Sequence, residues 1–314
     1  MLLDIGIFAV GLLGLYFGAE WLVKGASSLA LQLGVKPVVV GLTIIAVGTS
    51  SPELVVSMIA AVGQSQGLAL GNIIGSNIAN VGLVLGVSAM IAPLRVDSSV
   101  LRREMPVMLG VSAVFCFMLY DLTVSRLESF LLVCGLVTYM GYHLISAIRA
   151  SAIDRAGREE GDSEERESRL KNVSWVVVGI VLLVGGAQLM VRAGVSISKG
   201  LGISEVVIGI VLVAVGTSLP ELATSMVSAR RQESDLSISN VVGSNIMNIL
   251  LVIGLVGLVS PLTVEASLLS YELPAMFLFS LVLLPLMKTG GVLNRWEGAF
   301  LATAYTAFIV WMFY

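Results

Sequence analysis

Apolar stretches long enough to cross a bilayer occupy almost the whole chain, and they constrain its fold more than any other feature. A membrane-spanning helix needs about 20 mostly apolar residues. Glycine, proline and charged residues divide this chain into ten such stretches, at residues 5–31, 38–61, 68–91, 103–121, 127–148, 173–197, 206–229, 236–259, 270–287 and 295–313. Few residues remain outside them, so the sequence predicts an all-α polytopic membrane protein with ten transmembrane helices and no extramembrane domain.

The composition excludes two broad classes of protein. Charged side chains make up 12% of the 314 residues, whereas soluble domains average about 25%. This chain therefore cannot cover a water-exposed surface as a soluble enzyme does. Its net charge of −3 gives it no basic surface for nucleic acid.

One charged segment interrupts the apolar chain. Residues 149–172 hold 13 of the 39 charged residues, a density that cannot enter a bilayer. We expect a hydrophilic linker there that could contain one short charged helix. This linker divides the chain into a first repeat, residues 1–148, and a second repeat, residues 173–314.

The distribution of Lys and Arg predicts the orientation. Cytoplasmic loops of membrane proteins are enriched in these residues. With the linker in the cytoplasm, 15 of the 18 Lys and Arg side chains fall on the cytoplasmic side, and Arg126, Arg192 and Lys199 fall outside. Five spans on each side of the linker then place both termini outside the cytoplasm. The expected location is the plasma membrane.

The two repeats share polar motifs at a constant offset of 168 residues. Gly48–Glu53 reads GTSSPE and Gly216–Glu221 reads GTSLPE, while Asn72–Asn80 reads NIIGSNIAN and Asn240–Asn248 reads NVVGSNIMN. Because each repeat has five spans, an odd number, the second enters the membrane from the opposite face. Inverted repeats are typical of secondary transporters, whose binding sites lie near the bilayer midplane.

Two carboxylates lie near the middle of the second and seventh spans, those of Glu53 and Glu221. An ionisable group at that depth is unfavourable unless it is solvated or paired, which makes both candidates for function. Each shares a helix face with the hydroxyls three and four residues before it. These hydroxyls belong to Thr49, Ser50, Thr217 and Ser218.

Prolines precede both glutamates. Pro52 and Pro220 lack an N–H, and the ring of each clashes with the carbonyl four residues back, so both helices should kink. We expect backbone carbonyls near Ala46–Gly48 and Ala214–Gly216 to become available as ligands, as in other broken membrane helices.

The third and eighth spans supply further polar groups at the same depth. In each span a serine and an asparagine lie four residues apart on one face, and we expect both to be ligands: Ser76, Asn80, Ser244 and Asn248. Asn77 and Asn245 lie on a neighbouring face, and we expect them to form structural hydrogen bonds between helices.

Oxygen atoms dominate this group, which contains no His, Cys or Arg. Hard cations prefer such ligands, and Ca²⁺ takes six to eight oxygens in flexible geometry. An anionic substrate would require basic groups at this depth. Two carboxylates balance one Ca²⁺ or two Na⁺ equally well, which is a physical basis for exchange. No cofactor is expected.

On these residues the chain resembles the cation/calcium exchanger superfamily, prokaryotic sodium/calcium exchangers in particular. GTSSPE, GTSLPE and both G-S-N-I-x-N motifs carry the resemblance, which covers nearly the whole chain. It implies a Na⁺/Ca²⁺ antiporter with alternating access, in which spans one and six slide against the other eight. The cation ligands that it implies are Thr49, Ser50, Glu53, Ser76, Asn80, Thr217, Ser218, Glu221, Ser244 and Asn248, with the carbonyls of Ala46 and Ala214.

Several alternatives stay open. Sodium/calcium exchangers often carry Asp where Asn248 stands here, so H⁺-coupled or K⁺-dependent cation exchange is the rival transport function. A cation channel would need a similar midplane site. An intramembrane enzyme has no support, because the chain has neither an HExxH motif nor paired catalytic residues. The sequence sets no oligomeric state and is compatible with a monomer.

Glu20 in the first span has Lys24 four residues later, whereas Gln188 takes the equivalent place in the sixth span. We expect an ordinary ion pair between Glu20 and Lys24 near the cytoplasmic surface. The rival interpretation is a role for Glu20 in the ion pathway.

Overall fold

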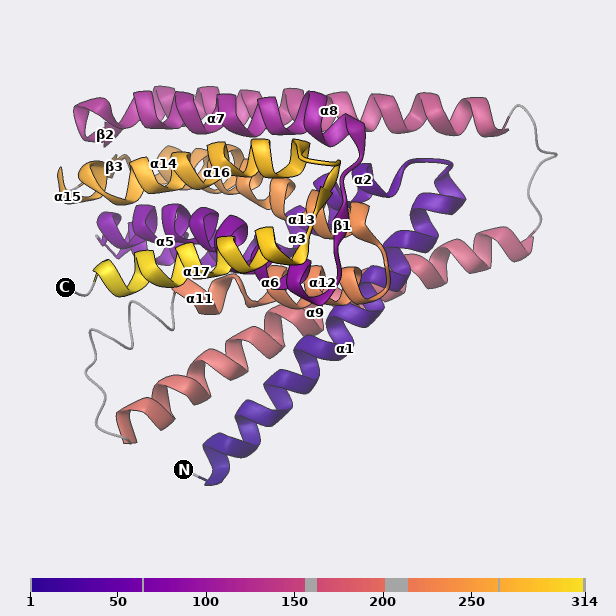
Figure 1. The fold of residues 1–314 in the computed structure, drawn as a ribbon, viewed down its shortest axis with the longest axis horizontal. Coiled ribbons are helices and arrows are strands. Elements are labelled where there is room, and N and C mark those ends of the chain that lie inside the picture. The colour runs from indigo at the N-terminus through magenta and orange to yellow at the C-terminus, as the bar shows by residue number, and fades with distance from the viewer. Residues whose placement is uncertain (1, 64, 156–162, 201–213, 265, 313–314) are drawn as a thin grey trace.

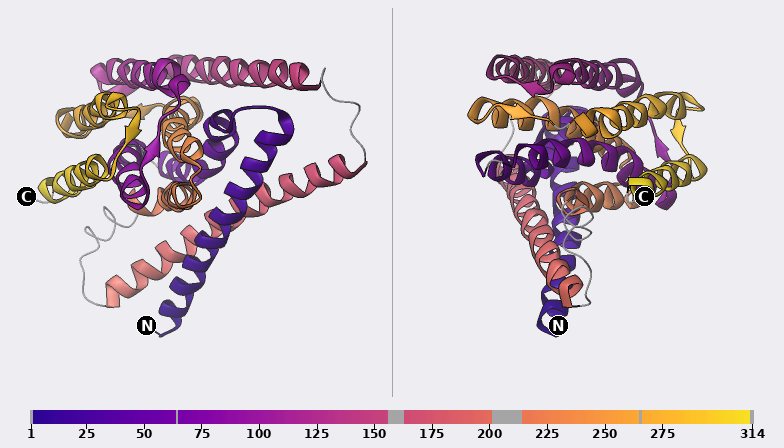
Figure 2. Two further views of the ribbon diagram at one scale, coloured as in Figure 1. Left: turned by 45° about the vertical axis from the view of Figure 1, so that its right-hand side comes forward. Right: turned by 90° about the vertical axis from the view of Figure 1, so that its left-hand side faces the viewer.

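The structure, a computed structural model, describes residues 2–63, 65–155, 163–200, 214–264 and 266–312. Long helices dominate it. Figure 1 shows most of them stacked in layers along one direction, with two long helices, α1 and α9, crossing beneath the stack at a steep angle. Figure 2 shows from two other directions that α1 and α9 stay together and project away from the remaining helices.

The first repeat begins with α1 (Leu2–Leu33). Its further elements are α2 (Pro37–Val40), the π-helical turn η1 (Gly41–Ile45), α3 (Ala46–Thr49), α4 (Ser51–Val62), α5 (Gln66–Ala79), the π-helical turn η2 (Asn80–Leu85), α6 (Gly86–Ile91), β1 (Leu94–Arg95), the π-helical turn η3 (Val100–Glu104), α7 (Met105–Met118), the 3₁₀ turn η4 (Leu119–Asp121), β2 (Thr123–Val124) and α8 (Arg126–Arg155).

The second repeat follows the same order where it is described. Its elements are α9 (Ser163–Gly200), α11 (Ala214–Thr217), α12 (Leu219–Arg230), α13 (Ser234–Met247), the π-helical turn η6 (Asn248–Ile253), α14 (Gly254–Val259), β3 (Leu262–Thr263), α15 (Ala266–Ser270), α16 (Glu272–Lys288), β4 (Val292–Leu293) and α17 (Arg295–Met312).

Seven of the described helices are long and apolar enough to cross a membrane, and the bent pair Pro37–Thr49 and Ser51–Val62 would make an eighth. These eight coincide with the expected spans one to six, eight and nine. The first part of the seventh span, residues 206–213, lies outside the described residues. The tenth span is present as helix α17, which has 18 residues.

The charged linker is more helical than expected. Helix α8 continues to Arg155 and α9 begins at Ser163, so the described ends of the linker extend the two flanking spans. Figure 1 shows both helix ends passing beyond the edge of the stack at which β1 lies. Glu, Arg and Ala all favour helix. The charges of Glu and Arg do not oppose helix formation once the chain has left the bilayer.

Two short strand pairs tie the repeats together at opposite ends of the stack. Strand β1 pairs with β4, and β2 pairs with β3, both antiparallel. The first pair joins the connection after span three to the connection after span nine. The second pair joins the connections after spans four and eight. Each pair therefore links connections that alternating spans place on the same membrane face, as an inverted duplication requires.

Helices α1 and α9 approach each other closely through glycines. A Cβ atom on Gly186 would lie 2.7 Å from the backbone oxygen of Gly11, and one on Gly18 would lie 2.9 Å from the oxygen of Gly179. Only glycine permits this contact, which small residues commonly provide between membrane helices. The buried apolar residues form two clusters, one centred on this pair and a larger one within the stack. The two helices thus pack most closely on each other, and their cluster also takes in stack residues such as Ile45 and Val227.

Candidate functional site

The expected kinks occur at Ser50 and Ser218. The helix conformation is interrupted there, with φ −77° and ψ 3° at Ser50 and φ −85° and ψ 4° at Ser218. Pro52 stands in the first turn of the new helix α4, where a proline leaves no hydrogen bond unmade. Glu53 and Glu221 consequently lie in the first turns of α4 and α12. The positive end of a helix dipole favours a carboxylate at such a position.

Six buried oxygens at the centre of the stack have no hydrogen-bond partner among the described residues, and they form three pairs at the 168-residue offset. They are the hydroxyls of Ser50 and Ser218, the Oε2 atoms of Glu53 and Glu221, and the Oδ1 atoms of Asn80 and Asn248. Each of these side chains is at most 1% exposed. Because buried polar groups are nearly always hydrogen-bonded, such a group requires a ligand or ordered water.

A serine of the same repeat donates to each carboxylate and also contacts a threonine hydroxyl of the opposite repeat. Ser76 Oγ donates to Glu53 Oε1 at 3.5 Å and lies 3.3 Å from Thr217 Oγ1 of the second repeat. In the second repeat, Ser244 Oγ donates to Glu221 Oε1 at 3.3 Å and lies 3.2 Å from Thr49 Oγ1 of the first repeat. The structure thus brings together the predicted residues of both repeats.

The four central asparagines pair across the repeats. Asn80 Nδ2 donates to Asn245 Oδ1, and Asn248 Nδ2 donates to Asn77 Oδ1, each at 3.0 Å. The prediction that Asn77 and Asn245 form interhelical hydrogen bonds is confirmed. Their partners are the asparagines expected to be ligands. The π-helical turns η2 and η6 begin at Asn80 and Asn248, and such turns occur frequently at functional sites.

Two residues near the site were missed by the sequence reasoning, Asn72 and Asn240. Asn72 Oδ1 accepts from Thr217 Oγ1 at 3.2 Å, and its Nδ2 donates to Ser57 Oγ at 3.0 Å. Asn240 makes the equivalent bonds with Thr49 and Ser225, at 3.2 and 3.0 Å. Both asparagines are the first residues of the repeated nine-residue motifs and lie 168 residues apart. The repeat could therefore have identified them as candidates.

The backbone oxygen of Ala46 is already engaged. It accepts the Ser50 N–H at 3.0 Å and the Thr49 hydroxyl at 3.4 Å. The interruption at Ser50 therefore does not release this carbonyl. Ala214 is the first residue of α11. The roles of Ala46 and Ala214 as ligands stay predictions.

Neutral oxygens outnumber charged ones at this site. No group of three or more His, Cys, Asp or Glu side chains that could hold a metal ion occurs in the described part of the chain. The negative charge comes from Glu53 and Glu221 alone among the predicted ligands, and hydroxyl and amide oxygens supply the rest. This chemistry suits a hard cation that binds reversibly, since Ca²⁺ accepts neutral oxygens readily.

Comparison with known proteins gives the family. The model of the sodium/calcium exchanger protein family matches residues 3–145 and 171–314. The chain belongs to the sodium/calcium exchanger family. This membership makes it a multi-span transporter and not an enzyme, and the two matched segments agree with its two repeats.

Relatives of this exchanger-family chain match over nearly their full length. The sodium/calcium exchanger MaX1 of Methanosarcina acetivorans is 36% identical over 344 residues, which cover 98% of each protein. The inner membrane protein YrbG of Escherichia coli is 34% identical over 285 residues, 90% of this chain and 88% of that protein. A solved structure of the sodium-calcium exchanger NCX_Mj superposes with a TM-score of 0.86 at 31% identity and covers 98% of both chains. The expected fold is thereby confirmed.

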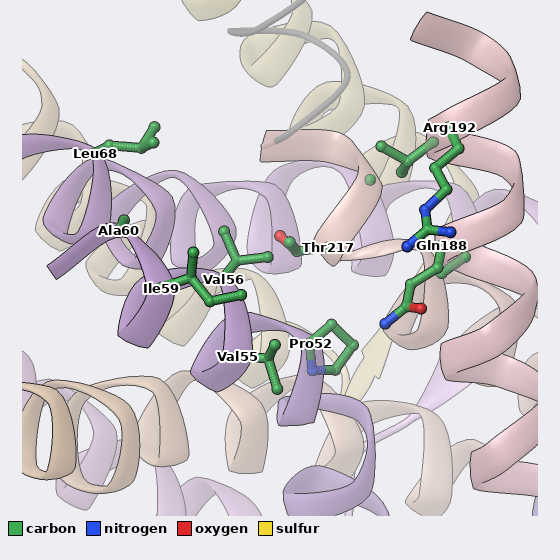
Figure 3. A pocket seen from close by; sticks show the side chains of 12 residues that line it. Pro52, Val55, Val56, Ile59, Ala60, Leu68, Gln188, Arg192 and Thr217 are labelled. Atoms are coloured by element: carbon green, nitrogen blue, oxygen red, sulfur yellow. The ribbon is translucent and has the colours of Figure 1, made fainter. Parts of the chain in front are cut away.

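A cavity of about 370 Å³ in this exchanger-family chain reaches the polar centre from one end of the stack. Figure 3 shows Val55, Val56 and Ile59 of α4 on one side and Gln188 and Arg192 of α9 on the other. Thr217, which bonds with Ser76 and Asn72, forms part of the wall. The lining joins the site to the space between α4 and α9.

At the other end of the stack the equivalent position is covered, since Val227, the counterpart of the cavity-lining Ile59, is only 7% exposed, and polar contacts join α1 to the connection between α12 and α13. Arg231 donates to Glu20 on α1, with 2.9 Å between Nε and Oε2, and Ser27 Oγ of α1 donates to Glu233 Oε1 at 2.9 Å. The expectation that Glu20 pairs with Lys24 is wrong. Lys24 Nζ instead lies 5.4 Å from the centre of the Trp175 ring, a cation–π distance.

Proposed function

We propose that this chain is a secondary antiporter that exchanges Na⁺ for Ca²⁺ across the membrane by alternating access. The observation that carries the proposal is the set of six buried oxygens, in three pairs related by the repeat, that have no hydrogen-bond partner among the described residues; it includes one oxygen of each carboxylate. A purely structural polar core would satisfy these atoms internally. Oxygen atoms of this kind are the ligands that Ca²⁺ and Na⁺ share.

The proposed cation ligands surround the six unpartnered oxygens. They are Thr49, Ser50, Glu53, Ser76, Asn80, Thr217, Ser218, Glu221, Ser244 and Asn248, with the backbone carbonyls of Ala46 and Ala214. The hydroxyl groups that bond to the carboxylates can rotate their hydrogens away and present an oxygen lone pair to a cation when one binds.

The relatives support this choice of ions. MaX1 is named a sodium/calcium exchanger. Structures of NCX_Mj come from crystals soaked with Na⁺ and Ca²⁺ or with Na⁺ and Sr²⁺. Both proteins are more than 30% identical to this chain over nearly its full length.

The charge of the site explains why one ion would be exchanged for the other. Two carboxylates are neutralised by one Ca²⁺ or by two Na⁺. Without cations, Glu53 and Glu221, both 0% exposed, would leave uncompensated charge in the interior. An unpaired buried charge is strongly unfavourable. The empty carrier is therefore disfavoured in moving between its two states, which couples the opposing fluxes.

Movement of α1 and α9 against the stack would provide alternating access. These helices pack tightly on each other through glycine, and most of the buried residues of the smaller apolar cluster belong to them. The cavity lies against α9 at one end, and the ion pair holds α1 at the other. We propose that the linker end faces the cytoplasm and that both termini lie outside, so the cavity faces outwards.

Calcium flux in reconstituted vesicles tests the function. Proteoliposomes loaded with Na⁺ and diluted into Na⁺-free medium should take up radioactive Ca²⁺, and vesicles with equal Na⁺ on both sides should not. Uptake driven by a pH jump without Na⁺ would instead identify an H⁺-coupled exchanger, and uptake requiring K⁺ a K⁺-dependent one. Calcium currents independent of any counter-ion would identify a channel. The absence of all Ca²⁺ movement would refute the proposal.

The orientation needs its own test. In a variant without native cysteines (Cys116→Ser, Cys134→Ser), a cysteine at Asp121, near β2, should react with a membrane-impermeant maleimide in intact cells. A cysteine at Ser98, near β1, should react only after lysis. The opposite pattern would reverse the proposed orientation and the direction in which the cavity faces.

A further inference from the structure

Asn80 and Asn248 each face their neighbours with a defined end of the amide. The amino group of Asn80 is bonded to Asn245 and that of Asn248 to Asn77. The opposite ends, the two Oδ1 atoms, have no hydrogen-bond partner in the described residues. A carboxamide can donate from one end and accept at the other. The orientation therefore decides whether a cation meets an oxygen or an N–H group.

The orientation of Asn245 is fixed by a backbone group. Its Nδ2 donates to the backbone oxygen of Asn77 at 3.3 Å and approaches Met108 Sδ at 3.9 Å. A reversed amide would set its own oxygen against that backbone oxygen, with two acceptors facing each other. Asn245 must therefore present Oδ1 to Asn80, which in turn must present Nδ2 to Asn245.

The orientation of Asn77 is held more weakly. Its Nδ2 points to Met276 Sδ at 3.6 Å, and a thioether is a weak acceptor. Asn77 still presents Oδ1 to Asn248 at 3.0 Å. Both asparagines are at most 1% exposed, so water does not compete for these bonds. The two halves of the site are thus constrained to different degrees.

We propose that Asn77 and Asn245 are positioning residues that hold Asn248 and Asn80 with their amide oxygens directed at the transported cation. They bind no ion themselves, and each acts across the boundary between the repeats. This inference rests on the proposed cation site and assigns a role to residues outside it. It predicts that replacing Asn77 or Asn245 weakens cation binding only while the ligand to which it is bonded, Asn248 or Asn80, is an amide.

The pair Asn77–Asn248 offers the cleaner experiment, because a carboxylate has two equivalent oxygens and needs no fixed orientation. Loss of a group that orients a metal ligand typically weakens binding about 10- to 100-fold, and Asn77→Ala should weaken Ca²⁺ binding by at least about tenfold. In the background Asn248→Asp, the same change should alter Ca²⁺ binding by less than about threefold, since either oxygen of the aspartate can face the cation. Asn77 can reverse to donate to that aspartate because only Met276 Sδ holds its amide.

Calcium binding to the full-length purified proteins, measured by titration calorimetry with and without competing Na⁺, gives the four affinities. Gel filtration establishes that each variant is folded. If Asn77→Ala does not yield folded protein, Asn77→Ser replaces it, because serine is too short to reach Asn248. Failure of the wild-type protein to bind Ca²⁺ or Na⁺ would overturn the proposed function itself. With binding intact, an equal loss in both backgrounds, or no loss in either, would overturn the positioning role.

Discussion

The polar contacts that close one end of the stack offer a test of the proposed movement. Arg231 binds Glu20 with two of its nitrogens, and Ser27 binds Glu233. At the 168-residue offset Glu20 corresponds to Gln188 and Glu233 to Ser65. Neither of these residues can form the same charged contact at the cavity end. The double variant Glu20→Gln/Glu233→Ser therefore gives the closed end the residues of the open one.

The expected effect of the double variant on opening follows from how exposed the contacting side chains are. The side chains of Arg231 and Glu20 are 39% and 19% exposed, so their ion pair contributes about 1 kcal/mol, the upper end for surface pairs. The bond between Ser27 and Glu233 is partly buried and adds about 1 kcal/mol. Loss of both favours opening at this end by about 2 kcal/mol, which is a factor of about 30 in the equilibrium.

Cysteine reactivity reports this equilibrium at equivalent positions of the two repeats. Ile59, which lines the cavity, is 68% exposed, whereas its counterpart Val227 is 7% exposed and packs in the cluster around α1. In the cysteine-free background, Val227→Cys should react slowly with a maleimide, because the open state is rarely populated. In the double variant its rate should rise about 30-fold, in proportion to the open population. The rate of Ile59→Cys should stay equal or fall.

Asp97→Asn serves as the matched control. Lys36 Nζ lies 3.0 Å from Asp97 Oδ2 at the same end of the stack, but neither residue is part of helix α1. This change should leave the rate at Val227→Cys unaltered. An unchanged rate in the double variant, measured in protein that still exchanges cations, would refute the idea that these contacts hold α1 in place.

Three further predictions concern the site, the helix contact and the surface. Glu221→Gln should abolish Na⁺-dependent calcium flux in vesicles, more than about 100-fold, because one of two buried charges is lost, while Glu128→Gln at the surface should not. Gly186→Ala should destabilise the protein by about 1–3 kcal/mol in thermal unfolding, since its Cβ would lie 2.7 Å from a backbone oxygen. Gly185→Ala should not destabilise it, because a Cβ there would meet no atom within 4 Å. Partial burial opposes the charged form of Asp97, but hydrogen bonds from Ser99 and Lys36 outweigh it and lower its pKa. Asp97→Asn should therefore lower the melting temperature at neutral pH, and the difference should vanish as the pH falls through the lowered pKa.

Each of these predictions has an outcome that contradicts it. Normal calcium flux in Glu221→Gln would remove Glu221 from the site. Equal melting temperatures for Gly186→Ala and Gly185→Ala would mean that α1 and α9 do not pack as closely as the structure has them. A stability difference for Asp97→Asn that persists unchanged in acid would mean that the charge of Asp97 does not stabilise the fold.

The predictable part of the site is the part that was duplicated. Glu53 and Glu221 were identified because they stand at mid-membrane depth in motifs repeated at a constant offset, and the unpartnered oxygens follow the same offset. Asn72 had the same signal and was missed, since its bond to Thr217 spans 145 residues and two helices. Spacing within one helix indicates which side chains share a face, but not which face of another helix they meet.

Contacts between different helices account for the other differences. Glu20 and Lys24 satisfy the spacing rule for an ion pair, yet Arg231 provides two donors from a neighbouring connection and Trp175 provides a ring for Lys24. An isolated helix would form the predicted pair, and tertiary packing replaces it. The helical ends of the linker show the reverse. Their residues favour helix locally, whereas from their charge we expected a hydrophilic linker with at most one short charged helix.

Symmetry explains why the differences between the repeats are as informative as the identities. If the two repeats were identical, exchanging their conformations would convert the state open at one end into the state open at the other, and the two states would have equal free energy. A preference for one state can then arise only at positions where the repeats differ. Glu20 and Gln188 form such a pair, as do Glu233 and Ser65, and the contacts of the two glutamates occur at the closed end. The proposed ligands match in type between the repeats, so under the proposed function they would bind the cation equally in both states, and we expect these unmatched residues to decide which way the site faces at rest.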